Sequence, residues 1–265
     1  MTLRQKYGDL AVVAGASEGL GAAFATHLAS SGFNLLLIAR RLEFLEQFGE
    51  KLAGQFHVQV NCVRCDLAAA SDVNDLQAIL AGRDVHLLVY NAALSFIGPF
   101  EDNTIEQHNA LIRVNVTAPL NLLQLLSGPM LTSRKGAIVL MSSLAGFQGS
   151  GYLAAYAASK AFNRVLAESL WYEWKNRGLD IIACCAGATA TPNFFKTNPG
   201  KKDFFAPKVQ LPEEVVAECF QQLGKRPSFI PGTGNKVAAF IMQRLLPRKM
   251  AIQMMGDTTR KMYRL

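Results

Sequence analysis

A tyrosine and a lysine stand four residues apart in the stretch GYLAAYAASK, which occupies residues 151–160. The alanine-rich composition predicts a helix, and i,i+4 spacing places the Tyr156 and Lys160 side chains on one face of it. A phenol has a pKa of about 10, which is too high for easy proton exchange at neutral pH, and a nearby ammonium group lowers it by stabilising the phenolate. The pair therefore indicates a proton donor. The alternative is an ordinary helix surface, on which Tyr152 lies one turn earlier.

Three glycines stand at the turn between the first apolar run and the helical pattern after it, in AGASEGLG at residues 14–21. Glycine permits positive φ and lets the backbone approach a pyrophosphate, whose charge is stabilised by the free N–H groups and dipole of the next helix. The spacing of Gly15, Gly19 and Gly21 is G-x-x-x-G-x-G, whereas the usual dinucleotide fingerprint is G-x-G-x-x-G. The turn predicts a dinucleotide site, and a turn that is merely tight is the alternative.

The end of the second apolar run, LLLIARR, bears on the choice of dinucleotide. An NAD-binding protein usually has Asp or Glu there to hold the ribose 2′-hydroxyl, whereas this chain has Ala39, Arg40 and Arg41. An arginine forms charge-assisted hydrogen bonds with a 2′-phosphate, so the sequence favours NADP over NAD. Glu18 in the glycine turn argues weakly the other way, and Arg41 is also compatible with an exposed position at the start of a helix.

The elements that must position these residues are short apolar runs that alternate with longer segments of helical spacing. Strands that are apolar on both faces and separated by helices predict a parallel sheet covered on both sides, which is a doubly wound, Rossmann-type α/β fold. Strands are expected at residues 10–15, 33–39, 58–63, 85–90, 136–142, 179–185 and 227–231. Helices are expected at residues 19–31, 41–53, 71–81, 104–127, 152–176 and 212–223.

No repeat or linker divides the chain, so residues 1–265 are interpreted as a single domain. Residues 191–211 are rich in proline, glycine and lysine, and they predict one long substrate loop. Residues 235–265 are expected to form a helical C-terminal extension.

Composition excludes several classes of protein. Half of the residues are apolar, the N-terminus lacks the features of a signal peptide, and no segment is apolar and uncharged for long enough to span a bilayer. The five cysteines include one C-x-x-C, Cys62 and Cys65, without the second pair or the histidines that a zinc site needs, so no metal is predicted. With Cys184 and Cys185 in a strand-like run, the cysteines fit a structural role in a reducing cytosol.

The net charge of +7 comes entirely from the C-terminal part of the chain. Residues 1–195 carry 14 basic and 15 acidic side chains, and residues 196–265 carry 13 and 5. Such a surplus can meet nucleic acid, anionic lipid or a phosphate-bearing substrate. These charges are scattered among apolar residues, however, which favours a solvated basic face and argues against a nucleic-acid partner.

The order of the motifs resembles the short-chain dehydrogenase/reductase (SDR) family over roughly residues 8–231. The motifs that carry the resemblance are AGASEGLG (14–21), CDLA (65–68), YNAA (90–93), RVNV (113–116), SSLAG (142–146), YAASK (156–160) and AGATAT (186–191). Their combination is far more specific than any one of them. Two positions depart from the family pattern, since Ala93 replaces the glycine of N-A-G and Ala186 replaces the proline that usually precedes Gly187.

The resemblance implies a mechanism based on serine, tyrosine and lysine. In the family, the tyrosine gives its proton to the substrate carbonyl oxygen as hydride reaches the carbon, the lysine also holds the nicotinamide ribose, and a serine hydrogen-bonds the reacting oxygen. The usual thirteen-residue separation before the tyrosine selects Ser143 over Ser142. Asn115 matches the family asparagine that shapes a helix and anchors a water of the proton relay, and a plain helix cap or helix-interior amide is the alternative.

The resemblance also implies the contacts to the cofactor. Asp66 matches the position that addresses the adenine, although a turn-forming role is the alternative, and Asn91 borders the cofactor beside the fourth strand. Thr191 and the backbone of Thr189 match positions that bind the carboxamide. The predicted cofactor-binding residues are Gly15, Ser17, Glu18, Gly19, Leu20, Gly21, Arg40, Arg41, Asp66, Leu67, Asn91, Ala92, Tyr156, Lys160, Gly187, Thr189 and Thr191.

Two apolar features bear on the substrate. The predicted loop contains Phe194, Phe195, Phe204 and Phe205, which suggest an apolar wall over the nicotinamide, with packing against the domain's own helices as the alternative. In the extension, the residues at helical spacing before Pro247, which ends that helix, are Val237, Phe240, Ile241 and Leu245. The extension is interpreted as an oligomer interface or core cover, as a roof over a lipidic or acyl substrate, or as a contact with a membrane surface.

The sequence thus predicts a cytoplasmic NADP(H)-dependent oxidoreductase that reduces a hydrophobic ketone or a 3-oxoacyl group. A homodimer or homotetramer is expected, because both are common in the family. The reverse oxidation of a secondary alcohol would use the same residues. A second hypothesis is a dinucleotide-binding regulatory or scaffold protein that has kept the fold without turnover.

Overall fold

Seven short apolar runs form one parallel sheet in the computed structural model, which describes residues 1–197 and 209–265. The strands are β1 (Leu10–Ala14), β2 (Asn34–Ala39), β3 (Val60–Arg64), β4 (Leu87–Tyr90), β5 (Gly136–Ser143), β6 (Leu179–Ala186) and β7 (Ser228–Phe229). Their order across the sheet is β3-β2-β1-β4-β5-β6-β7, the doubly wound Rossmann arrangement, so the predicted fold class is confirmed. The order reverses between β1 and β4, and a ligand crevice is expected beyond the carboxyl ends of these strands.

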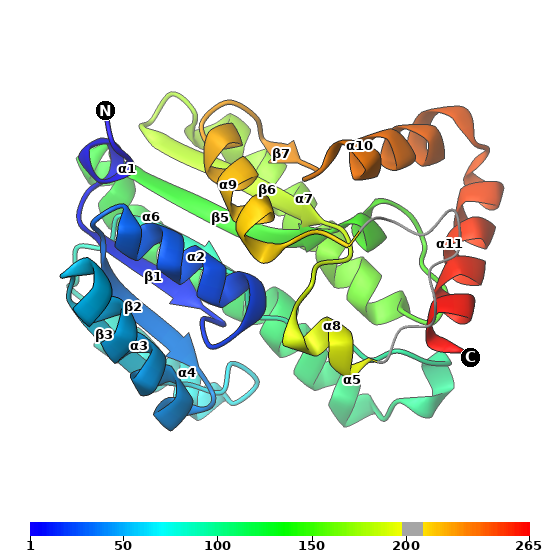
Figure 1. Cartoon of the computed structure of the whole chain (residues 1–265), viewed down its shortest axis with the longest axis horizontal. Coiled ribbons are helices and arrows are strands. Elements are labelled where there is room, and N and C mark those ends of the chain that lie inside the picture. Colours follow the sequence, from blue (N-terminus) through cyan, green and yellow to red (C-terminus); the bar gives the residue numbers. More distant parts are fainter. Residues whose placement is uncertain (198–208) are drawn as a thin grey trace.

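Helices cover both faces of the sheet (Figure 1). They are α1 (Leu3–Tyr7), α2 (Gly19–Ser30), α3 (Leu42–Phe56), α4 (Ala70–Leu80), α5 (Ile105–Ile112), α6 (Ala118–Ser133), α7 (Ala154–Trp174), α8 (Pro192–Lys196), α9 (Pro212–Gln222), α10 (Thr233–Phe240) and α11 (Arg248–Tyr263). Shorter segments are the 3-10 turns η1 (Phe100–Asp102) and η3 (Leu144–Phe147) and the π-helical turns η2 (Arg113–Thr117) and η4 (Ile241–Leu245). The helix predicted over residues 104–127 is thus divided by η2 and continues to residue 133.

The central strands are buried on both faces, as their continuous apolar sequence predicts. Val12 and Val13 of β1 are both fully buried, yet they belong to different layers. Val13 packs into the layer that contains α2, α3 and α9, and Val12 packs into the layer that contains α4, α6 and α7. Each such side chain contributes on the order of 1.5–3 kcal/mol on burial, so the sheet is a rigid platform for the loops at its carboxyl end.

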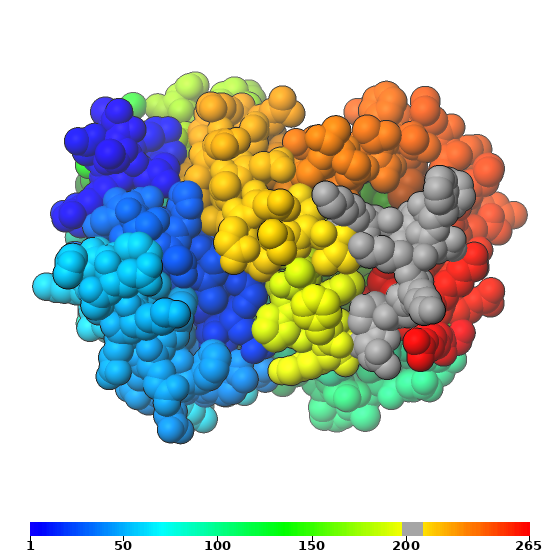
Figure 2. All heavy atoms as spheres, in the orientation of Figure 1, coloured from blue at the N-terminus to red at the C-terminus, as the bar shows by residue number. Residues whose placement is uncertain are grey.

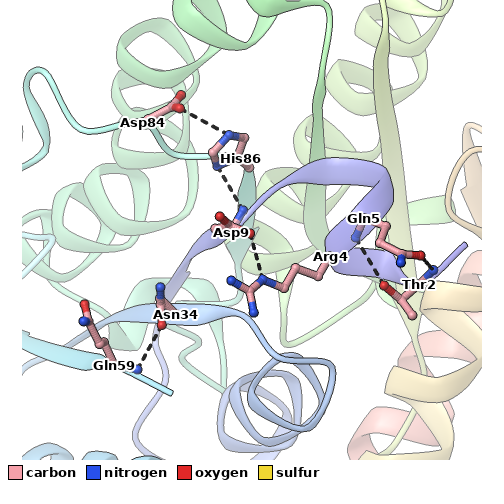
Figure 3. Close-up of polar contacts among 8 residues, drawn as sticks. All are labelled: Thr2, Arg4, Gln5, Asp9, Asn34, Gln59, Asp84 and His86. Carbon is pink, nitrogen blue, oxygen red and sulfur yellow. Dashed lines mark hydrogen bonds and ion pairs between the residues drawn. The ribbon is translucent and has the colours of Figure 1, made fainter. Parts of the chain in front are cut away.

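The amino ends of the strands are closed by local polar contacts and carry none of the predicted site residues (Figure 3). Thr2 and Gln5 form a reciprocal capping box at the start of α1. Asp9, just before β1, accepts a hydrogen bond from Arg4 at 2.7 Å, and its N–H donates to Nδ1 of His86 at 3.3 Å. This end of the sheet therefore serves stability, and the predicted site lies at the other end.

The segment predicted as one long loop after Thr191 contains the short helix α8. The Thr191 hydroxyl accepts a hydrogen bond from the N–H of Phe194 at 3.2 Å, and a proline occupies the first helical position. The prediction of a continuous loop is therefore wrong for residues 192–196, because a threonine cap followed by proline favours the start of a helix. Phe204 and Phe205, which belong to the same prediction, lie outside the described residues.

The C-terminal helices lie at the end of the molecule opposite β3 (Figure 1). In the space-filling view, the yellow segment around α8 lies between the blue N-terminal part and the red C-terminal end (Figure 2). The apolar stripe of α10 and η4 is 54%, 58%, 40% and 65% exposed at Val237, Phe240, Ile241 and Leu245, so it does not cover the chain's own core. The expected homo-oligomer and membrane-surface contact stay predictions. No helix in the described part of the chain has the length and apolar character needed to cross a membrane.

Candidate active site

Tyr156 and Lys160 lie one turn apart on α7, as their spacing predicts. The helix begins at Ala154, so Tyr152 stands outside it, with a left-handed φ of 62°. The expectation that the helix starts at residue 152 is therefore wrong. Tyr152 instead lines a small cavity of about 30 Å³ together with His108, and it is not equivalent to Tyr156.

The two serines at the end of β5 have different contacts. The Ser142 hydroxyl donates to the carbonyl oxygen of Lys160 at 2.7 Å, which ties β5 to α7. The Ser143 hydroxyl is hydrogen-bonded to the side chain of Tyr156, and it accepts the N–H of Ala145 at 3.2 Å. The structure thus brings Ser143 and Tyr156 together and leaves Ser142 in a structural position.

Lys160 is almost completely buried, with 2% of its surface exposed. Its Nζ donates to the carbonyl oxygen of Met141 at 2.9 Å and lies 5.6 Å from the centroid of the Tyr156 ring. Burial disfavours the charged amine and lowers the pKa of Lys160 to about 8. Glycine at position 146 makes this packing possible, because a Cβ there would lie 2.7 Å from the N of Ala161 and 2.8 Å from the carbonyl carbon of Lys160.

Burial raises the pKa of Tyr156, and this effect outweighs the lowering caused by its hydrogen bond with Ser143. Lys160 was expected to lower the pKa of Tyr156. This expectation is wrong when only the groups of the chain act on Tyr156. The reason is geometric, since Nζ lies over the phenol ring and donates to Met141. The phenol is protonated at neutral pH with its ordinary pKa of about 10 and remains so with the raised pKa, although burial makes it a weaker acid.

Asn115 is fully buried in η2, a π-helical turn of the kind that often occurs at functional sites. Its amide accepts the N–H of Leu94 at 2.8 Å and donates to the carbonyl oxygen of Leu94 at 2.9 Å. It also donates to Oγ of Ser159 at 2.9 Å, and Ser159 donates to the carbonyl oxygen of Tyr156 at 2.7 Å. These contacts position the turn that carries Tyr156. Ser159 was not among the predicted site residues, although its place inside YAASK offered a signal.

The glycine turn brings three backbone segments into contact. A Cβ on Gly21 would lie 1.8 Å from the carbonyl oxygen of Gly15, and a Cβ on Gly15 would lie 2.7 Å from the backbone of Ala92. Asn91 donates to the same Gly15 oxygen at 2.9 Å. Gly15 and Gly19 have positive φ of 79° and 59°, which residues with a side chain rarely adopt. The turn at the start of α2 therefore exposes backbone and no side chain at these two positions. The half-buried remaining members of the turn are Ser17, Glu18 and Leu20.

Arg40 and Arg41 differ in their surroundings although they are adjacent at the end of β2. Arg41 forms an ion pair with Glu18 at 2.9 Å and lies over the ring of Phe44. Arg40 is exposed, and among the residues that the structure describes it has no ion-pair or hydrogen-bond partner. Arg40 is thus the guanidinium available for a 2′-phosphate. The charge of Glu18, which argues weakly for NAD, is balanced by Arg41.

Asp66 and Leu67 follow β3 at the same edge of the sheet. The Asp66 carboxylate accepts the N–H of Ala68 at 3.0 Å, and the Asp66 N–H donates to Asp72 at 2.8 Å. The turn-forming role considered from sequence is therefore present. Leu67 lines a cavity of about 100 Å³ together with Thr117, and the adenine contact of this segment stays a prediction.

The loop after β6 reaches the glycine turn. A Cβ on Gly19 would lie 2.8 Å from Cγ2 of Thr191, so these two positions are in contact. Thr189 is buried and donates to the carbonyl oxygen of Gly187 at 3.1 Å. Gly187 lies against the amide of Asn235 in α10, which a Cβ would approach to 2.8 Å. This support from the C-terminal extension had no signal in the sequence motifs.

The two departures from the family pattern fit their surroundings. Ala93 is exposed, so its methyl group displaces no packed neighbour. Ala186 ends β6 in register with Ser143 of β5, and the strand pairing holds the backbone where a proline would otherwise stiffen it.

The arrangement fits a dinucleotide at the carboxyl ends of β1 and β4. The glycine turn offers open backbone at a helix N-terminus, Arg40 offers an unpaired cation, and Lys160 and Tyr156 stand beyond β5. Within residues 1–197 and 209–265, no group of three or more His, Cys, Asp or Glu side chains could hold a metal ion. The site can therefore bind a pyrophosphate and present a phenol to a polar substrate group.

Comparisons with known proteins agree with this geometry. The model of the family described as short chain dehydrogenase matches residues 9–202. A 7β-hydroxysteroid dehydrogenase of Mediterraneibacter gnavus is 32% identical over 240 residues, which are 90% of this chain and 91% of that protein. A solved structure from work on 7β-hydroxysteroid dehydrogenase stereoselectivity has a TM-score of 0.89 and 30% identity, over 96% of this chain and 99% of that one. A short-chain dehydrogenase from Sphingobium yanoikuyae in complex with NADPH has a TM-score of 0.76 and 27% identity, over 84% and 87%.

Proposed function

Because this chain belongs to the short-chain dehydrogenase family of oxidoreductases, we propose that it interconverts a bulky hydrophobic ketone and its secondary alcohol with NADP(H). The observation that carries the proposal is the contact between the Ser143 and Tyr156 side chains, with Nζ of Lys160 5.6 Å from the phenol ring. A non-catalytic scaffold is not favoured, because all three of these side chains are present and lie together. The cysteines of the described residues are free thiols, which supports the proposal that the protein acts in a reducing cytosol.

NADP(H) is the cofactor of choice in this proposal. The glycine turn would hold the pyrophosphate, Arg40 would hold the 2′-phosphate, and Lys160 would hold the nicotinamide ribose. The similarity to a short-chain dehydrogenase in complex with NADPH supports the choice. The chemistry that bound NADPH supplies is a hydride for the carbonyl carbon.

The side chains of the chain handle the oxygen of the substrate. The Ser143 hydroxyl would hydrogen-bond the carbonyl oxygen, and the Tyr156 hydroxyl would transfer its proton to that oxygen as negative charge develops. The pKa of Tyr156 lies above neutral pH, so the protonated form dominates there and a proton is available in the direction of reduction. The reverse oxidation requires the phenolate, so its rate should rise with pH.

A steroid-like ketone is the substrate class that the similarities support best. The relative named 7β-hydroxysteroid dehydrogenase matches 90% of this chain, and the solved structure from work on that activity covers 96% of it. A substrate of this size requires a wide apolar site, for which the C-terminal extension and α8 would supply further walls beyond the core fold. A 3-oxoacyl thioester serves as the competing substrate class in the test.

The test measures consumption of NADPH and of NADH with a 7-oxosteroid, a 3-oxoacyl thioester and cyclohexanone. We expect NADPH consumption with the 7-oxosteroid to be the fastest. Tyr156→Phe should lower kcat by about 10²–10⁴-fold and leave the Kd for NADPH nearly unchanged, because only the transferable proton is lost. Full activity of Tyr156→Phe would remove the proposed acid, and tight NADPH binding without turnover of any ketone would favour the scaffold.

A further inference from the structure

A small cavity lies between α5 and the start of α7. The loops that precede these helices are joined by a hydrogen bond from the N–H of Gly98 to the carbonyl oxygen of Tyr152 at 3.0 Å. Both residues line a cavity of about 30 Å³, together with Ala154 and Ala155 of the first turn of α7. Tyr156 belongs to the same turn, so the cavity adjoins the candidate acid. We call the loop before α7 and the helices packed on it the substrate side of Tyr156, and the glycine turn the cofactor side.

The lining of this cavity is mostly apolar. Its larger apolar members are Phe96, Phe100 and Leu111. The side chains of the lining that form hydrogen bonds belong to Asn103, His108 and Tyr152. Nδ2 of Asn103 donates to the carbonyl oxygen of Pro99 at 3.4 Å, so this group is partly committed. An apolar space with a few polar groups is the composition expected of a site for part of a small molecule.

His108 is the lining residue that its own surroundings do not satisfy. Both nitrogens of its ring are buried, and neither has a hydrogen-bond partner among the residues that the structure describes. The ring stacks on Phe100, with centroids 4.5 Å apart and planes 20° apart. Stacking uses the face of the ring and leaves the nitrogens at its edge unpaired. Buried polar atoms in native proteins are nearly always hydrogen-bonded, so the pair of unpaired nitrogens indicates a ligand group at this place.

Tyr152 supplies a second, independent observation at the same cavity. Its φ of 62° lies in the left-handed region, which a tyrosine rarely adopts. This backbone conformation is held by the hydrogen bond from Gly98, and Tyr152 lines the cavity and stands outside α7. Residues in sparsely populated backbone conformations cluster at ligand sites. Backbone strain and unpaired nitrogens therefore meet at one cavity.

The size and the chemistry of the cavity indicate a hydroxyl group. Its volume of about 30 Å³ exceeds the roughly 10–15 Å³ that one water-sized group needs, and it is too small for a hydrocarbon ring. A neutral imidazole has one donor and one acceptor nitrogen, and a hydroxyl likewise both donates and accepts. The χ2 torsion of histidine is broad, so a turn of the ring past Phe100, which is 61% exposed, brings a nitrogen to a group in the cavity.

We propose that His108 is a substrate-binding residue whose ring hydrogen-bonds a hydroxyl group that the substrate carries away from its reacting carbonyl. The proposal rests on the ketone reduction proposed above and deepens it, because it makes the substrate a hydroxylated hydrophobic ketone. Ser143 and Tyr156 would hold the carbonyl oxygen, and His108 would hold the hydroxyl. Two points of attachment fix the orientation of a bulky molecule, so a ketone with the hydroxyl is distinguished from one without it.

The experiment compares three 7-oxosteroids with NADPH: one without a hydroxyl, one with a hydroxyl on the first ring and one with a hydroxyl on the last ring. Both hydroxylated compounds are needed because either end of the ring system can face the cavity. Wild type should have a kcat/KM at least about 10-fold higher for one of them than for the unsubstituted ketone. His108→Leu should reduce this preference to within about 2-fold, chiefly through KM, and leave kcat/KM for the unsubstituted ketone within about 2-fold.

Two further variants separate the hydrogen bond from the packing of the ring. His108→Gln keeps a donor and an acceptor, so it should retain a preference of about 3-fold or more. The matched control is His27→Leu in α2, because His27 is also half-buried and stacked on a phenylalanine, Phe220, with centroids 4.7 Å apart. This control should keep the full preference of wild type.

A second measurement is independent of turnover. NADP⁺ and a 7-oxosteroid are both oxidised and cannot react with each other, so their complex with the protein reports binding alone. The chain has four histidines, and ¹⁵N spectra of histidine-labelled wild type and His108→Gln identify the ring signals of His108. The preferred hydroxylated steroid should shift these signals, and the unsubstituted steroid at the same occupancy should shift them less.

The outcomes separate this proposal from the proposed function. If wild type consumes NADPH with none of the three ketones, the proposed function is wrong and the role of His108 falls with it. If wild type reduces all three without preference, or if the preference persists in His108→Leu, the ketone reduction stands and the role of His108 is wrong. Unshifted ¹⁵N signals of His108 with the preferred steroid bound would also overturn that role and leave the ring a packing partner of Phe100.

Discussion

The cofactor side and the substrate side of Tyr156 both bring backbones together through glycines, but over different spans of chain. In the cofactor turn, Gly21 meets the carbonyl oxygen of Gly15, six residues earlier. On the substrate side, Gly151 meets Gly256 in the C-terminal helix. The first contact belongs to one short motif, whereas the second depends on the packing of the whole domain.

The two contacts also differ in the space that they leave. A Cβ on Gly21 would lie 1.8 Å from a backbone oxygen, whereas a Cβ on Gly151 would lie 3.3 Å from Cα of Gly256. Backbone at 1.8 Å has to move, and backbone at 3.3 Å has to shift by only a few tenths of an ångström. The cofactor side is therefore expected to be intolerant of change and the substrate side to be adjustable.

The largest expected effect comes from Gly21→Ala. The added methyl group displaces the Gly15 carbonyl and distorts the turn, so the Kd for NADPH should rise by at least about 100-fold. Gly54→Ala in α3 is the matched control, because a Cβ there meets nothing within 4 Å and a helical alanine should be neutral or stabilising. Isothermal titration measures both. Wild-type affinity in Gly21→Ala would show that the turn is adjustable, and the contrast between the two sides would fail.

The next effect concerns Lys160, which lies between the two sides. Its pKa falls from the ordinary 10.5 to about 8 in the folded protein, so between these pH values the unfolded chain holds the proton and the folded chain has released it. Stability from this group therefore rises as pH increases from 8 to 10.5 and is constant below pH 8. Relative to Lys160→Met, the unfolding free energy of wild type should increase by on the order of 3 kcal/mol over this range.

Denaturant unfolding without nucleotide, at closely spaced pH values, measures this difference. Other groups that titrate in the same range cancel in the comparison of wild type with Lys160→Met. A difference that stays constant with pH would mean that the folded protein holds Lys160 with its ordinary pKa.

A smaller effect separates the two arginines of the cofactor side. Arg40→Ala should raise the Kd for NADPH by about 10- to 100-fold and leave that for NADH unchanged, because a charge-assisted contact to the 2′-phosphate is lost. Arg41→Ala should change the NADPH affinity less, since Arg41 is paired with Glu18 at 2.9 Å. Fluorescence titration of both variants with both nucleotides gives the answer. A larger loss in Arg41→Ala would reassign the phosphate contact to that residue.

The smallest effect is expected from Gly151→Ala on the substrate side. The methyl group pushes α11 outward by a few tenths of an ångström, so KM for the 7-oxosteroid should rise by about 3-fold and the Kd for NADPH should stay unchanged. Gly128→Ala, where a Cβ meets nothing within 4 Å, is the control. A loss of NADPH affinity equal to the change in KM would mean that the two sides of Tyr156 are not independent.

The strands and most helices could be predicted from the sequence, because apolar runs and helical spacing are local properties. Some predicted helix boundaries were wrong. Their causes are local backbone features that the spacing of apolar residues does not indicate. Tyr152 leaves the helix through a left-handed backbone, η2 interrupts the helix at Asn115, and Thr191 with a following proline starts α8. These causes are a left-handed residue, a π-helical turn and a cap, none of which is a repeating pattern.

The sequence likewise predicted some parts of the candidate site and not others. The contact of Ser143 with Tyr156 and the placement of Lys160 followed from motifs of fixed spacing. The roles of Gly146 and Asn235 were not indicated, because each is defined by a partner in another element. Ser159 lies inside the YAASK motif, but its partner Asn115 belongs to another element. The raised pKa of Tyr156 was also missed, since burial outweighs the effect of a neighbouring residue that spacing alone can identify.

The sequence by itself determined the parallel sheet, the dinucleotide turn and the order of the residues proposed for catalysis, since each is encoded within a run of about ten residues or a fixed spacing. Only the tertiary structure decided which arginine is free, how deeply Lys160 is buried, and that α11 packs against the loop before α7 through Gly151 and Gly256. The physical reason is that charge pairing, burial and the closing of a site depend on groups that meet in space from distant parts of the chain. In this protein, the substrate side of Tyr156 is the part formed by groups from distant parts of the chain.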